Sequence, residues 1–334
     1  MENILNKMRP FVSKYINGLL KSIKQARQPQ KKIDLFLNLS TICNYNCIFC
    51  NRNVTKKIIR LHEIVNINEF AEHARMVDIT GYGEITCHPD FLEIIRFFYN
   101  KNIAIRFVTN GSKLTKESAD YLVRSKIFEI VISLNSLTPE TYTRLHGDHT
   151  SLANTLENIE YLFSLPHNFP IRLSFVITSY NLHEIPNFIQ YAKKNRAASI
   201  SCLGLTPTLQ HMYPADLIVD NTKKDREFLD SMRELAKSEG VEAYICQLEN
   251  QSTPEIPIDP ARLKEMIKSC DWVYNKFFIE PDGKVAPCCW SRINLGNIKE
   301  KSFNEIWLGK PYKNLRKKIK TGISPSCQNC RRLN

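Results

Sequence analysis

Three cysteines share one short stretch of this 334-residue chain, at Cys43, Cys47 and Cys50. Thiolates at this C-x3-C-x2-C spacing can hold three corners of a [4Fe-4S] cluster, and no fourth cysteine nearby completes the set. One iron would therefore keep an open position for a ligand. A zinc site completed by a histidine such as His62 is the alternative, because clustered cysteines in the cytosol are often zinc ligands.

The residues before the cysteines predict a strand, because Ile33 to Ser40 alternate apolar residues with others. The cysteine loop would then leave the carboxyl end of a strand, where α/β barrels keep their active sites. At these residues the chain resembles the radical S-adenosylmethionine (SAM) superfamily, which has an aromatic residue, here Phe49, before the third cysteine. The resemblance implies that the open iron binds SAM and that its cleavage gives a 5'-deoxyadenosyl radical.

Strand-like runs alternate with helical ones from residue 33 to about 205. This alternation predicts parallel βαβ units. Six units fit the partial (β/α)6 TIM-type barrel that radical SAM enzymes share, so the expected fold class is α/β. The strands are expected at 33–40, 76–81, 103–109, 128–135, 170–178 and 198–204.

The second strand runs into Gly81-Tyr82-Gly83-Glu84. This stretch is similar to the family's GGE motif, and the resemblance implies that Gly81, Gly83 and Glu84 bind the SAM amino group. One departure is visible, since Ile85-Thr86-Cys87 stands where many relatives have Pro and an apolar pair.

Polar residues also end the third and fourth strands. Ser133 and Asn135 are two apart and point to the same face, and by resemblance they would contact the SAM ribose or carboxylate, although many relatives have Asp at the second position. Asn110 is either a further SAM contact or part of a Thr-Asn-Gly turn. Arg144 stands where relatives often have a basic residue near the cofactor, and a solvated helix charge is the alternative.

The pattern loosens after residue 205, and prolines at 254, 257 and 260 interrupt regular structure. We therefore expect three parts. The first part is 1–32, which contains a basic amphipathic helix over residues 10 to 27. The second is a radical SAM core over 33–250, and the third is a cysteine-rich domain over 251–334.

The last part carries a second set of cysteines, Cys270, Cys288, Cys327 and Cys330. Pro281-Asp282-Gly283 between two strand-like runs, 277–280 and 284–287, predicts a hairpin. The set resembles the twitch form of the SPASM domain, which implies a four-cysteine auxiliary [4Fe-4S] cluster. Cys289 would then not be a ligand, although it could take the place of Cys288 in the set. The alternative for the whole set is a structural zinc site.

Four cysteine ligands leave no open iron, so the auxiliary cluster is expected to transfer electrons. Molybdenum-cofactor cyclases differ, because their second cluster has three cysteines. The chain resembles more closely the twitch dehydrogenases that oxidise an alcohol on an aminocyclitol. We therefore expect a radical SAM oxidoreductase that acts on a small polar, sugar-like molecule by a two-electron oxidation. The alternatives are a peptide- or protein-modifying maturase and an epimerase in which Cys202 or Cys246 returns a hydrogen atom, although a buried cysteine is usually a small hydrophobe.

Composition sets the remaining expectations. The chain is 43% hydrophobic and 24% charged, and it has no long apolar run, so we expect a cytoplasmic protein without a membrane partner. Its net charge of +12 suits an anionic ligand or an acidic electron donor of the flavodoxin or ferredoxin type. No motif for reading bases is present, so no nucleic-acid partner is expected.

We expect the reconstituted protein to contain about eight irons, the sum for two [4Fe-4S] clusters, and to cleave SAM under reduction. Changing Cys43, Cys47 and Cys50 together to Ala should leave about four irons and no 5'-deoxyadenosine, measured by iron analysis and chromatography. SAM cleavage by that triple variant would contradict the assignment.

Overall fold

The computed structural model describes residues 32–50, 55–205, 213–247, 260–289, 291, 293–322 and 327. The predicted helix over 10–27, the segment with Pro254 and Pro257, and Cys330 lie outside the described residues.

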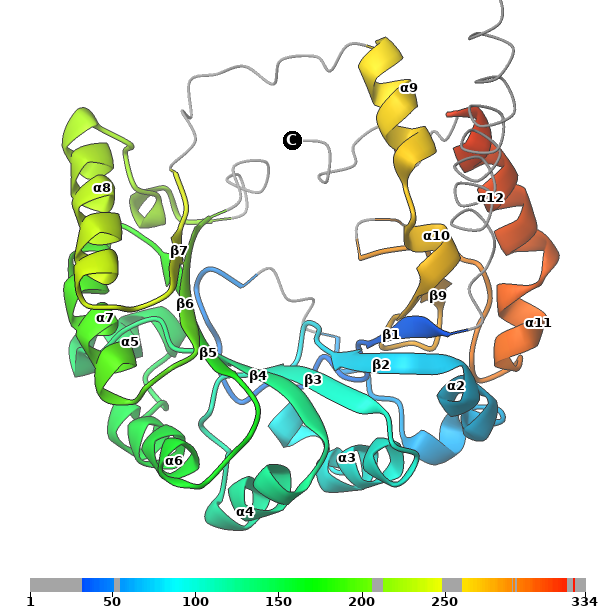
Figure 1. Cartoon of the computed structure of the whole chain (residues 1–334), viewed down its shortest axis with the longest axis horizontal. Helices are drawn as coiled ribbons and strands as arrows, with labels where there is room; N and C mark the ends of the chain where they lie inside the picture. Colours follow the sequence, from blue (N-terminus) through cyan, green and yellow to red (C-terminus); the bar gives the residue numbers. More distant parts are fainter. Residues whose placement is uncertain are drawn as a thin grey trace, which may run out of the picture.

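One sheet forms the centre of the structure, with the strand order β7-β6-β5-β4-β3-β2-β1-β8-β9. Neighbouring strands pair in parallel, except for the antiparallel pair β8 and β9. The sheet curves into an open arc, as Figure 1 shows, and this arrangement confirms the predicted α/β partial barrel. The six predicted strands are β1 (Ile33–Leu37), β2 (Ala74–Ile79), β3 (Ala104–Thr109), β4 (Ile127–Ser133), β5 (Ile171–Ile177) and β6 (Ser199–Gly204), and β7 (Ala243–Ile245) follows them.

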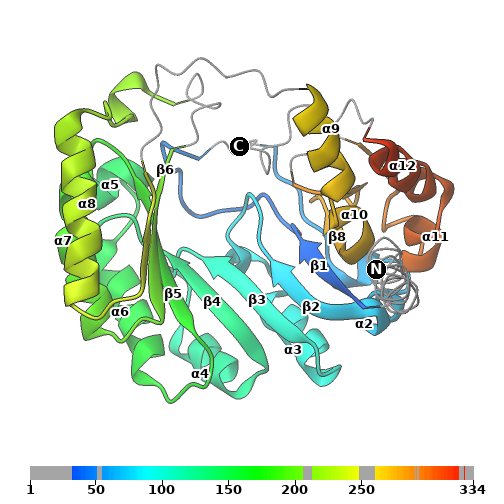
Figure 2. The ribbon, with the colours of Figure 1, turned by 45° about the horizontal axis from the view of Figure 1, so that its top comes forward.

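Helices cover the convex side of the arc (Figures 1 and 2). Phe107 of β3 lies 5.7 Å from Phe91 of α3, and Phe175 of β5 lies 4.9 Å from Phe188 of α7, measured between ring centroids. Among the described residues no helix has both the length and the apolar character to cross a bilayer. The helices up to β7 are α2 (Ile67–His73), α3 (Phe91–Asn100), α4 (Lys116–Arg124), α5 (Pro139–His146), α6 (Leu152–Ser164), α7 (Ile185–Lys194) and α8 (Lys223–Ser238), with short 3-10 turns η1 (Leu61–Glu63), η2 (Ile85–Cys87), η3 (Leu182–Glu184) and η5 (Ala215–Leu217).

The predicted hairpin is present as β8 (Lys276–Ile279) and β9 (Val285–Ala286). Gly283 in its turn has φ +87°, a conformation that glycine adopts without strain. β8 also pairs in parallel with β1, and Asn38 N donates to Ile279 O over 3.0 Å. The cysteine-rich segment therefore extends the same sheet, a pairing that the sequence did not predict. The helices around it are α9 (Pro260–Ser269), α10 (Trp272–Asn275), α11 (Phe303–Trp307) and α12 (Lys310–Thr321).

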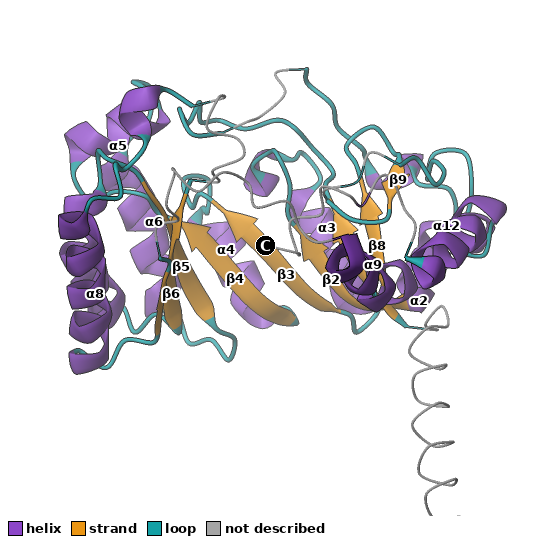
Figure 3. Ribbon diagram, turned by 90° about the horizontal axis from the view of Figure 1, so that it is seen from above, coloured by secondary structure: helices purple, strands orange, loops and turns teal. Residues whose placement is uncertain are grey.

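Longer loops gather at the carboxyl ends of the strands, and Figure 3 shows them on the side to which the strand arrows point. Because the parallel strands of the barrel end at the same edge, residues far apart in sequence meet there.

Paired charges lie on the concave face of the sheet. Arg106 Nη1 is 2.8 Å from Asp78 Oδ2, and Arg106 Nε is 2.6 Å from Glu129 Oε2. The other oxygen of Glu129 is 2.6 Å from Arg172 Nε. Both carboxylates are buried, so each depends on its arginine partner for its charge to be tolerated.

We expect Arg106→Met to lower the free energy of unfolding by about 3–5 kcal/mol, because Asp78 would keep a buried charge without its partner. Arg172→Met is the matched control, since Arg172 is half exposed and Glu129 would keep Arg106. That change should cost about 0–1 kcal/mol. Urea unfolding followed by circular dichroism measures both, and equal small losses would contradict the assignment.

Candidate active site

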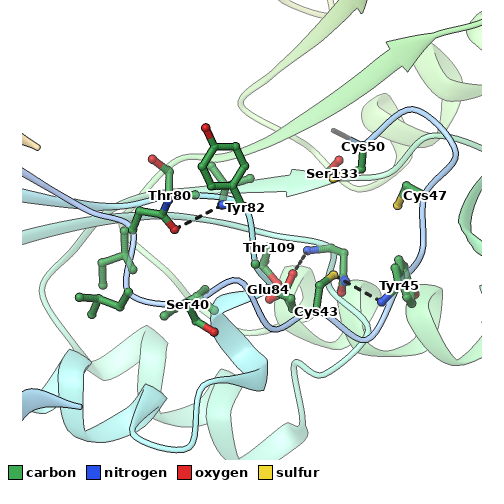
Figure 4. Close-up of a pocket in the computed structure, with 18 of the residues that line it drawn as sticks. Ser40, Cys43, Tyr45, Cys47, Cys50, Thr80, Tyr82, Glu84, Thr109 and Ser133 are labelled. Atoms are coloured by element: carbon green, nitrogen blue, oxygen red, sulfur yellow. Dashed lines mark hydrogen bonds between the residues drawn. The ribbon is translucent and has the colours of Figure 1, made fainter. Parts of the chain in front are cut away.

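A cavity lies at the carboxyl ends of β1 to β4, and most of the predicted site residues line it. Figure 4 shows the cysteine loop beside the strand ends that carry Glu84, Thr109 and Ser133. The cavity brings together the predicted residues Cys43, Cys47, Cys50, Gly81, Gly83, Glu84, Asn110, Ser133 and Asn135.

The cysteine loop is held against the end of α5. Asn46 N donates to His146 O and Ile48 N donates to Leu145 O, each over 3.0 Å. The Tyr45 hydroxyl lies 2.7 Å from the Tyr142 hydroxyl, so a buried tyrosine pair also fixes the loop. The three cysteines are thus presented by a loop whose backbone is already positioned.

Glu84 connects the cysteine loop to the ends of β2 and β3. Its backbone N donates to Ile42 O over 2.8 Å. Its carboxylate accepts from Thr109 Oγ1 at 2.7 Å and from Asn110 N at 2.6 Å. Thr86 N and Oγ1 donate to it as well, at 3.0 and 2.7 Å. These four hydrogen bonds use most of the accepting capacity of a carboxylate, so Glu84 is a structural anchor of the site.

Both predicted glycines lie where the backbone runs close to other groups. A Cβ on Gly83 would lie 2.5 Å from Ser40 O and 2.6 Å from Ile42 O. A Cβ on Gly81 would lie 2.0 Å from Asn38 Oδ1. Glycine at these positions lets β2 end directly against the cysteine loop.

Asn110 forms the turn that was one of its two predicted roles, and its contact with SAM stays a prediction. It lines the cavity, and its Oδ1 accepts from Ser112 N at 3.0 Å in a turn that includes Gly111, with φ +79°. Asn135 is buried, with Oδ1 accepting from Val176 N at 2.8 Å and Nδ2 3.3 Å from Ser133 Oγ. It therefore also ties β4 to β5.

Three residues that were predicted for SAM binding or hydrogen-atom transfer do not line this cavity. Arg144 is exposed, and its guanidinium stacks on Tyr180, 3.4 Å from the ring centroid. Cys202 is fully buried in the hydrophobic core. Cys246 is half-buried, and its Sγ accepts from Gly204 N at 3.0 Å.

His146 lines the cavity and was not predicted. Its Nδ1 is 3.0 Å from Cys47 Sγ, and burial lowers the pKa of His146 to about 4, so the ring is neutral near pH 7. A thiolate bound to iron can only accept a hydrogen bond, so Nδ1 would then carry the proton. The signal in the sequence was its spacing, because Tyr142 and His146 are four apart and share a helix face.

Asn38 is a second residue that the sequence reading missed, although it follows a strand that ends at the site. It is buried in the cavity wall, and its Nδ2 has no hydrogen-bond partner among the described residues. An unpaired buried donor is costly unless a ligand satisfies it. Three thiols with an unpaired amide donor suit a cluster and a polar ligand such as SAM.

Cys270 and Cys288 lie at the end of the sheet that β8 and β9 form. Cys270, between α9 and α10, Cys288, just after β9, and Cys327 are half-buried, whereas Cys289 is exposed. Among the described residues, no three His, Cys, Asp or Glu side chains are close enough to hold a single metal ion. A [4Fe-4S] cluster differs from such a site, because each thiolate binds a separate iron. His62, the alternative zinc ligand, is exposed and does not line the cavity.

Two family models match the chain. The Radical SAM superfamily matches residues 37–192, and the SPASM iron-sulfur cluster-binding domain matches residues 270–331. The two matches contain all seven predicted cysteine ligands.

Curated relatives and solved structures agree with these matches. The chain is 26% identical to an AdoMet-dependent heme synthase of Methanosarcina barkeri, over 80% of each protein. It is 26% identical to the antilisterial bacteriocin subtilosin biosynthesis protein AlbA of Bacillus subtilis, over 79% of this chain but 57% of AlbA. Streptococcus suis SuiB bound to precursor peptide SuiA has a TM-score of 0.66 and 17% identity, over 91% of this chain and 71% of SuiB, which shows the fold alone.

We expect Gly83→Ala to abolish SAM binding, because the added methyl cannot fit between the Ser40 and Ile42 carbonyls without moving the cysteine loop. Gly240→Ala is the control. Its Cβ meets nothing within 4 Å, and its φ of +69° should cost about 1 kcal/mol of stability. Anaerobic calorimetry with SAM compares the two variants, and wild-type affinity in Gly83→Ala would contradict this account.

Proposed function

Because the chain belongs to the radical SAM superfamily and carries a C-terminal SPASM domain, we propose that it oxidises a small polar substrate by two electrons. When bound, SAM and its cluster supply a 5'-deoxyadenosyl radical that takes a hydrogen atom from the substrate, and the auxiliary cluster supplies an acceptor for the second electron. A secondary alcohol would leave as a ketone, with its second hydrogen lost as a proton. The reducing electron would come from a flavodoxin- or ferredoxin-type protein.

The cysteines have separate roles in this proposal. We assign Cys43, Cys47 and Cys50 to the cluster that binds SAM. The auxiliary cluster is assigned to Cys270, Cys288, Cys327 and Cys330. Cys288 is favoured over Cys289 because Cys288 is half-buried and Cys289 is exposed.

We propose a polar substrate because a row of serine hydroxyls lines the concave face of the sheet. Ser133 lines the cavity, and it pairs in register with Ser174 of β5, which pairs with Ser201 of β6. Side chains at paired positions share one face of a sheet. The three hydroxyls therefore extend from the cavity across the concave face, where they can bind the hydroxyl or amino groups of a small substrate.

The same register separates the two candidate hydrogen-atom donors. Cys202 follows Ser201, so it points to the opposite, helix-covered face. Tyr244 pairs with Ser201, and Cys246 is two residues further along. Cys246 is therefore the better candidate if the enzyme is an epimerase, and Cys202 serves as its matched control.

Peptide modification is the second candidate. It is supported by the similarity to AlbA, which is named for bacteriocin biosynthesis, and by the fold shared with SuiB, whose structure contains a precursor peptide. The relative named as a heme synthase makes a small molecule and matches more of its own length, 80% against 57% for AlbA. We therefore rank the small-molecule substrate first.

Deuterium transfer into 5'-deoxyadenosine can identify the substrate class. A deuterated cell extract is divided by ultrafiltration into small molecules and peptides, and each fraction is incubated with reduced enzyme and SAM. We expect the small-molecule fraction to label 5'-deoxyadenosine, detected by mass spectrometry. Labelling by the peptide fraction alone would favour peptide modification.

The reaction class needs a second readout. We expect a product two hydrogens lighter than the substrate, with about one equivalent of 5'-deoxyadenosine, unchanged by Cys246→Ala or Cys202→Ala. A product of unchanged composition that takes deuterium from heavy water at one carbon, and loses it in Cys246→Ala, would overturn oxidation in favour of epimerisation.

A further inference from the structure

Three buried hydrogen-bond donors on α11 and α12 have no acceptor among the described residues. They are Trp307 Nε1, the Tyr312 hydroxyl and Arg316 Nη2. Their residues are only 2%, 0% and 6% exposed, so water does not reach them freely. An unpaired buried donor costs about 1–3 kcal/mol, and a charged one costs more. Three together indicate an acceptor that is absent from the described protein.

The three side chains form one cluster. The rings of Trp307 and Tyr312 are 4.7 Å apart, and Arg316 Cζ lies 4.2 Å and 4.7 Å from their respective centroids. Arg316 Nε donates to Val273 O at 2.8 Å, and Nη1 donates to Trp307 O at 2.7 Å. These two bonds fix the guanidinium and leave Nη2 for another group.

The missing acceptor should carry negative charge. Arg316 forms no ion pair within the part of the chain that the structure describes. Burial lowers the pKa of the Arg316 guanidinium to about 10. The hydroxyls of Tyr312 and Tyr274 act in the opposite direction and raise this pKa. A buried cation is strongly unfavourable without a counter-ion.

Two of the auxiliary cysteines, Cys270 and Cys288, are linked to this cluster. Val273, which accepts from Arg316, is on α10, just after Cys270. Burial raises the pKa of Tyr312, Arg316 lowers it and Cys288 raises it again, so the Cys288 thiol and the Tyr312 hydroxyl lie within electrostatic range of each other. Cys327 follows Thr321, the last residue of α12, by six residues in the sequence.

We propose that Trp307, Tyr312 and Arg316 form a donor shell around the auxiliary cluster, where they donate hydrogen bonds to its sulfur atoms and balance its charge. This rests on the proposed function, because it takes Cys270, Cys288, Cys327 and Cys330 as the ligands. Four thiolates outweigh the positive charge of the iron core, so the cluster is an anion. Hydrogen bonds to sulfur and a nearby cation stabilise its reduced form and raise its reduction potential. The shell would thus make the cluster a better electron acceptor.

The test uses the full chain with Cys43, Cys47 and Cys50 changed to Ala, so that the auxiliary cluster alone gives the signal. Tyr312→Phe and Arg316→Gln are each added, and the clusters are reduced stepwise under electron paramagnetic resonance. At a fixed potential, we expect the ratio of reduced to oxidised cluster to fall about threefold or more in Tyr312→Phe and about tenfold in Arg316→Gln. A tenfold change corresponds to about 59 mV for one electron.

Two matched controls separate the shell from general effects of the substitutions. Tyr191 on α7 also has a buried hydroxyl without a partner among the described residues, so Tyr191→Phe should leave the potential unchanged. Arg233 also donates to backbone carbonyls, those of Ile245 and Cys246, so Arg233→Gln should leave it unchanged as well.

Unchanged potentials in both shell variants, with iron content retained, would overturn the shell and leave the proposed function standing. If Arg316→Gln does not fold, the potential of Tyr312→Phe decides alone. A triple cysteine variant that folds but holds no cluster would overturn the auxiliary site itself, and the shell with it.

Discussion

The active site depends on how Glu84 joins three pieces of chain that are distant in sequence. Its backbone N holds the cysteine loop at Ile42, and its carboxylate holds the end of β3 through Thr109 and Asn110. The carboxylate is buried, so its charge is tolerated because donors surround it. Gly83 lets the same turn approach the loop without a side chain in between. The position of the three thiols over the strand ends therefore follows from one satisfied carboxylate.

The curvature of the sheet gives its two faces different tasks. The convex face is apolar and packs on helices, as Phe107 on α3 and Phe175 on α7 show. The concave face carries ion pairs through Arg106 and hydroxyls such as Ser133. A parallel strand alternates between these faces with every residue. A one-residue shift in register would therefore bury the polar row and expose the core, so folding and the proposed binding of substrate constrain the same strand pairing.

Much of this arrangement could be predicted from local patterns. The six barrel strands were found because apolar alternation and βα spacing are local signals, and the Gly81 to Glu84 turn was found by its resemblance to a motif. The pairing of β8 with β1 was not predicted, because the partner of an edge strand is set by tertiary contacts. Arg144 was expected near the cofactor, but its contact with Tyr180 depends on a loop that joins other strands. His146 was missed because its importance comes from docking against Cys47.

The surroundings of the two cysteine sets differ in a way that suits opposite electron flow. Near the SAM-binding set, the neutral His146 ring has its Nδ1 3.0 Å from Cys47 Sγ, and Tyr45 N donates to Cys43 Sγ over 3.4 Å. In the segment that carries the auxiliary set, Arg316 Nη2, Trp307 Nε1 and the Tyr312 hydroxyl have no acceptor among the described residues. Each additional donor or positive charge favours the reduced form of a cluster. A cluster that must reduce SAM benefits from few such groups, and one that must accept an electron from a substrate radical benefits from many. In the proposed reaction, the side chains packed around each cluster would thus set the direction of electron transfer, although both sites hold the same type of cluster.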